Sequence, residues 1–462
     1  MRGLIVMETT MRALPFVLLA LLTSPALAEP QLIARLDIDG AQGDLAANTA
    51  APLENGVAGN LLGGLGSGMA WAGGDTFLML PDRGPNAVPY NGYVDNTTSY
   101  VPRFQTFAFR LTPQTSGLPY RVEAHLDATT LLWSPTRLAY GSGLAAHIGN
   151  GAPAINTPDR FYFSGRSDNM DRSQASDFDG DARLDPESLR VANDGKSVFI
   201  SDEYGPHIYQ FDRQTGERLR SFTLPQGFAV SFLSPRGDEE LSGNISGREA
   251  NHGMEGLSIT PDGRTLVGIM QTALIQDGGE KDGGDLRMLA IDIASGSAKQ
   301  YAYPLDNWGS EDKPKYNAVS EILAVNDHQF LVDERDGKGR GTASSAANKL
   351  IYLADIAGAQ DISGLTGRKA LRKAAIQKSL FLDLVAVLNA GGVPSEAIPS
   401  KIEGMSFGPD VTLDGKTLHT LWISSDNDFL SAADSLPNPN TVYVIGFSDA
   451  DLPGYQPQRL AQ

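Results

Sequence analysis

The chain of 462 residues contains no cysteine, which excludes disulfide bonds, thiolate metal ligands and lipid attachment at a cysteine. It has only six histidines, all scattered, and it lacks the Walker A and H-E-x-x-H motifs of nucleotide and zinc sites. The stability of the fold must therefore come from its apolar core. Any metal site has to be built mainly from oxygen ligands.

Basic residues are scarce relative to acidic ones, with 37 Lys and Arg against 55 Asp and Glu and a net charge of −18. A surface of this charge repels nucleic acid and anionic membranes, so we expect neither as a partner. A highly anionic substrate would also be repelled unless bound cations reversed the local field.

Long apolar runs are missing apart from residues 13–22, which follow Arg12 and precede the small-residue stretch A-L-A. This run is too short to span a bilayer, and its flanks are typical of a cleaved signal peptide. We therefore predict a signal peptide over residues 1–28, with Met11 as an alternative start, and one mature domain over residues 29–462. Because this exported chain has no disulfides, we expect it in the bacterial periplasm or secreted.

A two-strand unit occurs five times in the chain. Each copy has an alternating apolar strand, a turn rich in Gly, Asp or Asn and a second apolar strand, which is the pattern of a β-hairpin. Pattern and turn agree in all five copies. The first strands begin at Ser67, Glu187, Glu255, Glu321 and Glu403.

A further strand pair follows most of these hairpins, as in residues 208–224 and 287–303. Four strands per repeat make one blade, so we predict an all-β chain folded as a single β-propeller. We expect about six four-stranded blades, with five or seven as alternatives, because the long gap after Ser67 has room for a divergent blade. Residues 365–392 have a partly helical pattern and are predicted to be a short insertion.

Acidic residues recur at fixed points of the repeat. Inner strands line the central channel of a propeller, so acids at the starts of the first strands and the ends of the second should meet at one rim. Carboxylates at this density need raised pKa values or bound cations, and oxygen ligands suit Ca²⁺ better than zinc. We predict a divalent cation, best matched by Ca²⁺, with ligands among Glu187, Asp202, Glu255, Glu321, Glu334, Glu403 and Asp426.

Each of these acids also has a purely structural interpretation, since it could cap its own strand or pair with Arg190 or Arg335. The acidic loop at residues 177–187 does not settle the question. It resembles an EF-hand, but Gly180 and Ser188 do not fit the glycine and bidentate acid positions of that motif.

Six residues near the acids are candidates for catalysis. Arg83 and Arg335 could bind a phosphate or carboxylate, or only neutralise the acids. His207 and His252 flank acidic motifs, where an imidazole can act as general acid or base, although a loop histidine bonded to backbone is the alternative. The candidates are Asp82, Arg83, Glu203, His207, His252 and Arg335.

Several motifs of the repeat match a known pattern: DPESLR with SDEYGPHIYQFD, NHGMEGLSITPDGRTLVGIMQTAL, SEILAVNDHQFLVDERD, KIEGMSFGPD with SSDNDF, and PDRGPN. Together they resemble the phytase-like family described as having esterase-like activity of phytase, from about Gly63 to the C-terminus. The resemblance implies an exported β-propeller whose acids carry a phosphoesterase-like activity. The chain departs from the family at Ser188, where the family has Gly, and the R-H-G-x-R-x-P motif of histidine acid phosphatases is absent.

Three functions fit these observations. The first is a metal-dependent hydrolase of phosphate esters or phosphodiesters at the acidic rim. The second is a calcium-dependent lactone or carboxylic ester hydrolase, and the third is a propeller that binds a ligand without catalysis. For all three we expect a monomer whose ligand is a small molecule.

Overall fold

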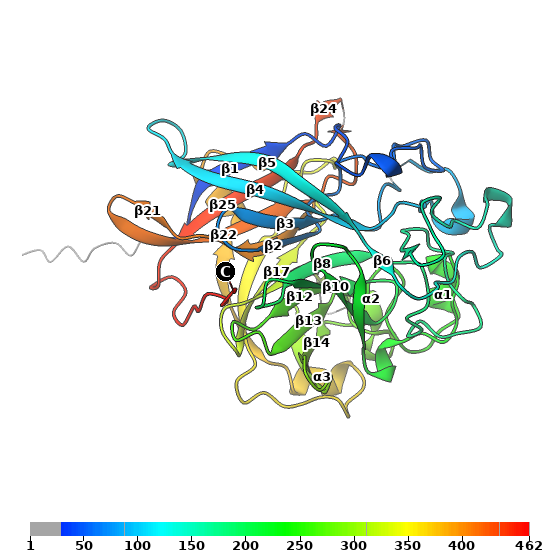
Figure 1. The fold of residues 1–462 in the computed structure, drawn as a ribbon. Helices are drawn as coiled ribbons and strands as arrows, with labels where there is room; N and C mark the ends of the chain where they lie inside the picture. The colour runs from blue at the N-terminus through cyan, green and yellow to red at the C-terminus, as the bar shows by residue number, and fades with distance from the viewer. Residues whose placement is uncertain (1–28, 87, 311, 434, 462) are drawn as a thin grey trace, which may run out of the picture.

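Antiparallel strands dominate the computed structural model, which describes residues 29–86, 88–310, 312–433 and 435–461. The predicted signal peptide and the alternative start at Met11 lie outside these residues. Five sheets of the described part each contain a path of four hydrogen-bonded strands, and each sheet is one blade. The all-β propeller predicted from the repeat is therefore confirmed (Figure 1).

The blades are numbered here by their inner strands along the chain. Blade 1 consists of β2 (Gly68–Trp71), β3 (Thr76–Leu80), β4 (Arg103–Pro113) and β5 (Tyr120–Leu131). Blade 2 consists of β8 (Pro186–Val191), β9 (Ser197–Asp202), β10 (His207–Asp212) and β11 (Arg218–Thr223). Blade 3 consists of β12 (Met254–Ile259), β13 (Thr265–Met270), β14 (Asp285–Asp292) and β15 (Ala298–Pro304).

Blades 4 and 5 complete the ring. Blade 4 consists of β16 (Ala318–Ala324), β17 (Gln329–Arg335), β18 (Lys349–Asp355) and β19 (Gln377–Asp383). Blade 5 consists of β20 (Ile402–Phe407), β22 (Lys416–Ser425), β25 (Asn440–Phe447) and β1 (Gln31–Ile38), with β21 (Val411–Leu413) paired to β22.

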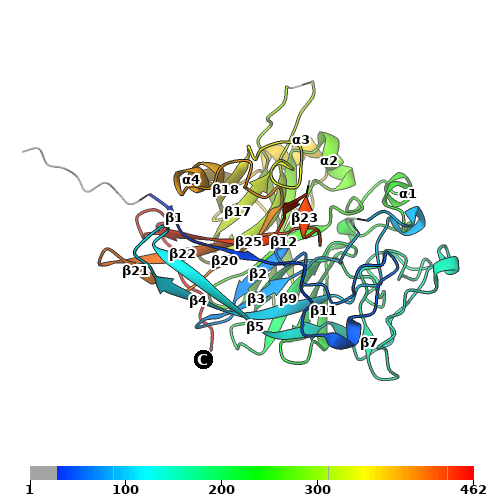
Figure 2. The ribbon, with the colours of Figure 1, turned by 90° about the horizontal axis from the view of Figure 1, so that it is seen from above.

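The inner strands contact one another in the order β2, β8, β12, β16 and β20, and β20 contacts β2. The ring therefore closes with five blades, which is one of the two alternatives to the six that we preferred. Residues 132–185, which had room for a sixth blade, form long loops with one small sheet of β6 (Trp133–Ser134) and β7 (Phe161–Tyr162). These loops and α1 (Gly237–Ser242) lie on the same side of the ring, at the right of Figure 2.

The first and last strands of the described chain meet in blade 5. The outer strand β1 pairs antiparallel with β25, with Leu36 opposite Val442 and Ile38 opposite Asn440. Both views show β1 beside β25 and against blade 1 (Figures 1 and 2). Hydrogen bonds between the first and last strands thus hold the ring closed.

Apolar clusters fill the spaces between neighbouring blades, because alternate residues of every inner strand face the blades on either side. Between blades 5 and 1, Trp422 packs against Phe77 at 4.5 Å and Phe109 at 5.8 Å between ring centroids. The inner strands are buried on both faces, and their ends are left to carry the polar groups of the two rims.

The predicted insertion at residues 365–392 is partly helical, with α3 (Arg368–Lys373) and α4 (Leu384–Ala390), but β19 between them completes blade 4. No helix in the part of the chain that the structure describes has the length and hydropathy of a membrane span. The remaining short elements are α2 (Gly279–Asp282), β23 (Ala432–Ala433), β24 (Leu436–Pro437) and the 3-10 helices Ala47–Thr49, Gly92–Val94, Ala146–Ile148, Gln226–Phe228 and Ile275–Asp277.

The C-terminal segment crosses the rim opposite the acidic residues and covers that end of the channel. Tyr455 packs on Phe407 of blade 5, with ring centroids 4.4 Å apart. The segment then bonds to the blades one after another: Gln456 N donates to Val325 O, Arg459 N to Pro261 O and Ala461 N to Asn193 O. One end of the channel is thereby closed.

Candidate functional site

A β-bulge near the start of each inner strand decides which side chains reach the acidic rim. The pairing shifts register at Glu187 in β8, at Glu255 in β12 and at Glu403 in β20, so these three acids hold equivalent positions. In β16 the shift falls at Ser320, and Glu321 lies one residue further along the strand. A shift of one residue turns a side chain in a new direction. The sequence alignment that made Glu321 equivalent to the other acids was therefore wrong.

Glu321 lies inside the channel instead of at the rim. Its carboxylate accepts a hydrogen bond from Ser188 Oγ at 2.9 Å and lies 2.9 Å from Arg190 Nη2. The same carboxylate accepts from Leu257 N at 3.2 Å, and Arg190 donates to the carbonyl of Met69 at 2.7 Å. Burial is the largest influence on Glu321 and raises its pKa to about 7, although the charge of Arg190 lowers it. This network joins blades 1, 2, 3 and 4, so we leave Glu321 out of the proposed metal ligands.

Two further predicted ligands hold local structure. Asp202 accepts hydrogen bonds from the backbone N–H groups of Asp185, Tyr204 and Gly205, which fix the turn after β9. Glu334 accepts from Tyr303 Oη at 2.6 Å and pairs with Lys378, and these partners lie on the outer strands of blades 3 and 4. The side chain that reaches the rim belongs to the next residue in both cases. It is Glu203 after Asp202 in blade 2, and Arg335 after Glu334 in blade 4.

The carboxylates that do gather at the rim outnumber their cations. Burial is the largest factor in raising their pKa values: to about 7 for Asp82, to about 8 for Glu203, and well above the ordinary range for Glu187, Glu255 and Asp426. Neighbouring carboxylates add to the increase, as Glu255 does for Glu187. The rim contains seven carboxylates and three cations, which are Asp82, Asp185, Glu187, Glu203, Glu255, Glu403 and Asp426 with Arg83, Arg335 and Lys401.

Three of these acids form a compact group that we name the triad: Asp185, Glu187 and Glu203. One carboxylate oxygen of each lies within 4.8 Å of the others, and all three residues are buried. Arg83 is the cation beside them, with Nη1 2.5 Å from Asp185 and 3.9 Å from Glu203. A buried group of carboxylate oxygens with one arginine beside it has the oxygen donors that a hard divalent cation requires, and a bound cation would replace the protons that these acids hold.

Two of the other rim acids have close side-chain partners. Glu403 accepts from Arg335 Nη2 at 2.6 Å, and Glu255 accepts from Gln271 Nε2 at 2.8 Å. Lys401 Nζ lies 2.6 Å from Asp428 and 3.5 Å from Asp426, whose buried Oδ2 has no hydrogen-bond partner among the described residues. These pairs continue the rim around blades 3, 4 and 5, whereas the triad occupies blade 2.

The two candidate histidines differ in position. His207 is fully buried on β10, its Nε2 lies 3.2 Å from the carbonyl of Asp177, and burial lowers its pKa to about 4. Its Nδ1 lies 4.0 Å from Asp202, which fixes the turn after β9, so we leave His207 out of the proposed catalytic residues. His252 is partly exposed beside the triad, its Nδ1 lies 3.6 Å from Glu249, and the amide of Gly253 donates to Glu203. Burial lowers the pKa of His252, but Glu249, Glu203 and Glu280 outweigh it, so the net shift is upward.

Sequence reasoning left out two rim residues and one motif. Asp185 and Lys401 were not selected, although each lies two residues before a selected glutamate at the start of an inner strand. Residues 404–408 also read G-x-S-x-G, the sequence of a nucleophile elbow. Ser406 lies within β20, where its hydroxyl donates to Phe407 O and accepts from Trp71 N, so it is a buried strand residue.

Comparison with known proteins identifies the family. Residues 60–429 match the family described as "Phytase-like: Esterase-like activity of phytase". The chain belongs to the phytase-like family. The match spans all five inner strands and the whole acidic rim, so the triad and its arginine lie within the phytase-like region.

One curated relative and several solved structures are similar to this phytase-like chain. An uncharacterized secreted protein of Arthroderma benhamiae is 32% identical over 197 residues, which cover 37% of this chain and 38% of that protein. A putative 6-phosphogluconolactonase from Bacteroides uniformis and the periplasmic gluconolactonase of Pseudomonas aeruginosa each have 12% identity, a TM-score of 0.32 and coverage of 82% and 88% of the two chains. Hydrazine synthase of Kuenenia stuttgartiensis has 12% identity and a TM-score of 0.31, with coverage of 79% and 78%. Similarity this weak leaves the reaction to be judged from the site itself.

The raised pKa values of the rim predict how stability depends on pH. Between the ordinary carboxyl pKa values and those of the rim, about 7 for Asp82 and about 8 for Glu203, the folded metal-free chain binds protons that the unfolded chain releases. The free energy of unfolding in EDTA should therefore fall as pH rises from about 5 to about 8. Urea titrations measure it, and Glu203→Gln should flatten the slope. An unchanged slope in that variant would mean that Glu203 is ionised in the folded chain.

Proposed function

We propose that this phytase-like chain is an exported hydrolase of phosphate esters that requires a divalent cation. The cation that suits the site best is Ca²⁺, and Asp185, Glu187 and Glu203 would hold it. The observation that carries the proposal is the buried triad with its single arginine. The family description, which names an esterase-like activity, supports hydrolysis. The segment at residues 1–28 and a relative named as secreted support export.

Each residue of the site has a role in this proposal. A bound cation would neutralise the triad and polarise a phosphoryl oxygen. Arg83, which is charged and held in place by Asp185, orients the phosphate through its remaining N–H groups. Glu255 is held by Gln271, and once a bound cation has lowered its raised pKa and ionised it, its carboxylate could take a proton from the attacking water. His252 is kept protonated by the acids around it and can supply a proton to the leaving group.

A substrate screen tests the proposal directly. Purified mature protein is assayed with p-nitrophenyl phosphate, bis(p-nitrophenyl) phosphate and p-nitrophenyl acetate, each with Ca²⁺ and with EDTA. We expect hydrolysis of one or both phosphate esters in Ca²⁺ and its loss in EDTA. Turnover of the acetate alone would favour a carboxylic ester hydrolase. No turnover of any of the three, in a protein that binds Ca²⁺, would favour a binding propeller.

A further inference from the structure

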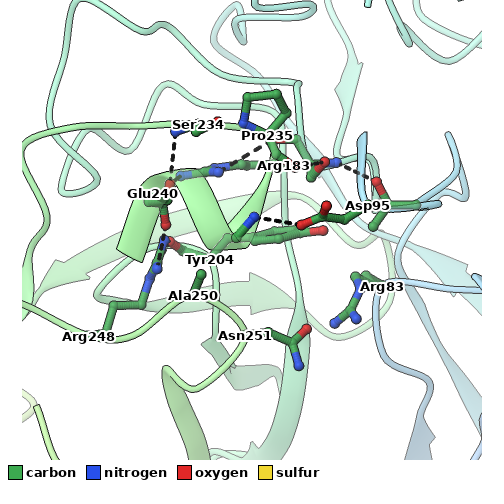
Figure 3. Close-up of a pocket in the computed structure, with 13 residues that line it drawn as sticks. Arg83, Asp95, Arg183, Tyr204, Ser234, Pro235, Glu240, Arg248, Ala250 and Asn251 are labelled. Atoms are coloured by element: carbon green, nitrogen blue, oxygen red, sulfur yellow. Dashed lines mark hydrogen bonds and ion pairs between the residues drawn. The ribbon is translucent and has the colours of Figure 1, made fainter. Parts of the chain in front are cut away.

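A small pocket of about 50 Å³ opens beside the triad, among the loops at the rim of blades 1 and 2. Arg83, Tyr204, Asn251 and the residues around α1 line it. Figure 3 shows Arg83 and Asn251 on one side of this hollow, and the network of Arg183, Glu240 and Arg248 on the other. Three arginines face two acids in its lining, in a chain whose net charge is −18. The lining therefore concentrates arginine side chains beside an acidic rim.

The pocket contains N–H groups that the protein does not use. The Arg183 side chain is only 3% exposed, and its Nη2 has no hydrogen-bond partner among the described residues. The nearest carboxylate to this Nη2 is that of Glu240, at 3.5 Å. The buried Nε of Arg83 likewise has no partner among these residues. Leaving a buried charged donor without a partner is costly, so such donors indicate a ligand that would accept their hydrogen bonds.

The neighbouring groups hold these donors in place. Arg248 donates to Glu240 Oε1 at 2.6 Å, so this glutamate is shared between two arginines and cannot satisfy Arg183 alone. Tyr204 donates its hydroxyl to Gly165 O at 2.8 Å and forms a wall of the pocket. Asn251 has a left-handed backbone with φ of 58°, which brings its amide to the pocket from the loop before His252. The two arginines are therefore held in place before a ligand arrives, whereas the Asn251 side chain is exposed.

We propose that this pocket binds one phosphate group of the substrate, with Arg183, Asn251 and the Nε of Arg83 donating to its oxygens. The inference rests on the proposed function and deepens it. Arg83 joins the pocket to the triad because its Nη1 is bound to Asp185. A tetrahedral oxyanion in the pocket would therefore lie next to the carboxylates that hold the cation.

Calorimetry with inorganic phosphate tests the pocket without any turnover. We expect phosphate to bind the EDTA-treated protein and to bind about tenfold more weakly to Arg183→Gln, since a hydrogen bond to a charged group is lost. Asn251→Gly keeps the left-handed backbone and removes the amide, so it should weaken phosphate binding even if Arg183→Gln does not fold. Asp414→Gly, at a left-handed position on the opposite hairpin of blade 5, is the matched control and should leave binding unchanged.

The outcomes separate this inference from the proposed function. Phosphate binding that needs Ca²⁺ and is unchanged in both pocket variants would overturn the pocket, because the anion would then bind only to the metal. Acetate that binds as well as phosphate would overturn the choice of phosphate in favour of a carboxylate. Phosphate that binds in EDTA and is weakened by both variants supports the pocket, even if no ester in the screen is hydrolysed.

Discussion

Replacing Glu321 by Ala should lower the free energy of unfolding by about 3–5 kcal/mol. The substitution removes the carboxylate that neutralises Arg190 in the middle of the channel, where both side chains are at most 4% exposed. The arginine would remain charged and buried, with only carbonyl oxygens around it. Ser188 Oγ and the amide of Leu257 would lose their acceptor as well. Urea unfolding monitored by tryptophan fluorescence measures the loss.

The double variant Arg190→Met with Glu321→Leu is the control for this result. It removes both charges and fills the space with apolar atoms, so most of the lost stability should return. Ser188→Gly, which restores the residue usual in the family, should cost only about 1 kcal/mol because Arg190 still neutralises Glu321. A loss below about 1 kcal/mol in Glu321→Ala would show that the channel network contributes little to stability.

Replacing Glu203 by Gln should reduce hydrolysis of a phosphate ester by about 10²–10³-fold. The amide keeps the shape of the side chain but removes one charge from the triad and leaves a weaker ligand for the cation. Stabilisation by Ca²⁺ should fall in parallel. For the unaltered protein, Ca²⁺ at about 100 times its Kd should add about 2.7 kcal/mol to the free energy of unfolding.

Asp333→Asn is the matched control for the triad variant. Asp333 is also a fully buried acid, burial raises its pKa to about 8, and neither of its oxygens has a hydrogen-bond partner in the described part of the chain. It lies on β17, outside the triad, so its substitution should leave both the activity and the Ca²⁺ response nearly unchanged. Equal losses in Glu203→Gln and Asp333→Asn would indicate a general electrostatic effect, which would contradict a metal site at the triad.

The propeller itself could be predicted because hairpin pattern and turn composition agree five times. The number of blades could not, since residues 132–185 have the length of a blade but form only a two-stranded sheet of Trp133–Ser134 and Phe161–Tyr162 among the described residues. The fourth strand of blade 5 could not be predicted from the sequence either. It is β1, which lies more than 350 residues before its inner strand β20, and no local pattern joins them.

The acidic rim was predictable as a set but not residue by residue. A bulge is an extra residue in one strand, and it leaves little trace in a pattern of alternating apolar residues. In blade 4 the bulge residue is Ser320, so the glutamate after it points into the channel and not toward the rim. Neighbouring residues at the end of β9 also point in different directions, so Glu203 reaches the rim and Asp202 does not. Burial and pairing of these acids depend on neighbouring blades, which no single repeat contains.

The pairing of β1 with β25 makes β1, the first strand of the described chain, the last to find its partner. Synthesis proceeds from the N-terminus, so β1 remains unpaired until more than 400 further residues have been made. Throughout that time its N–H and C=O groups form an open edge, which another chain can pair with. A β1 that closes the ring of a second copy would produce a domain-swapped dimer. Ring closure, which depends on contacts between the two ends of the sequence, should therefore set the folding rate and the yield of correctly folded protein.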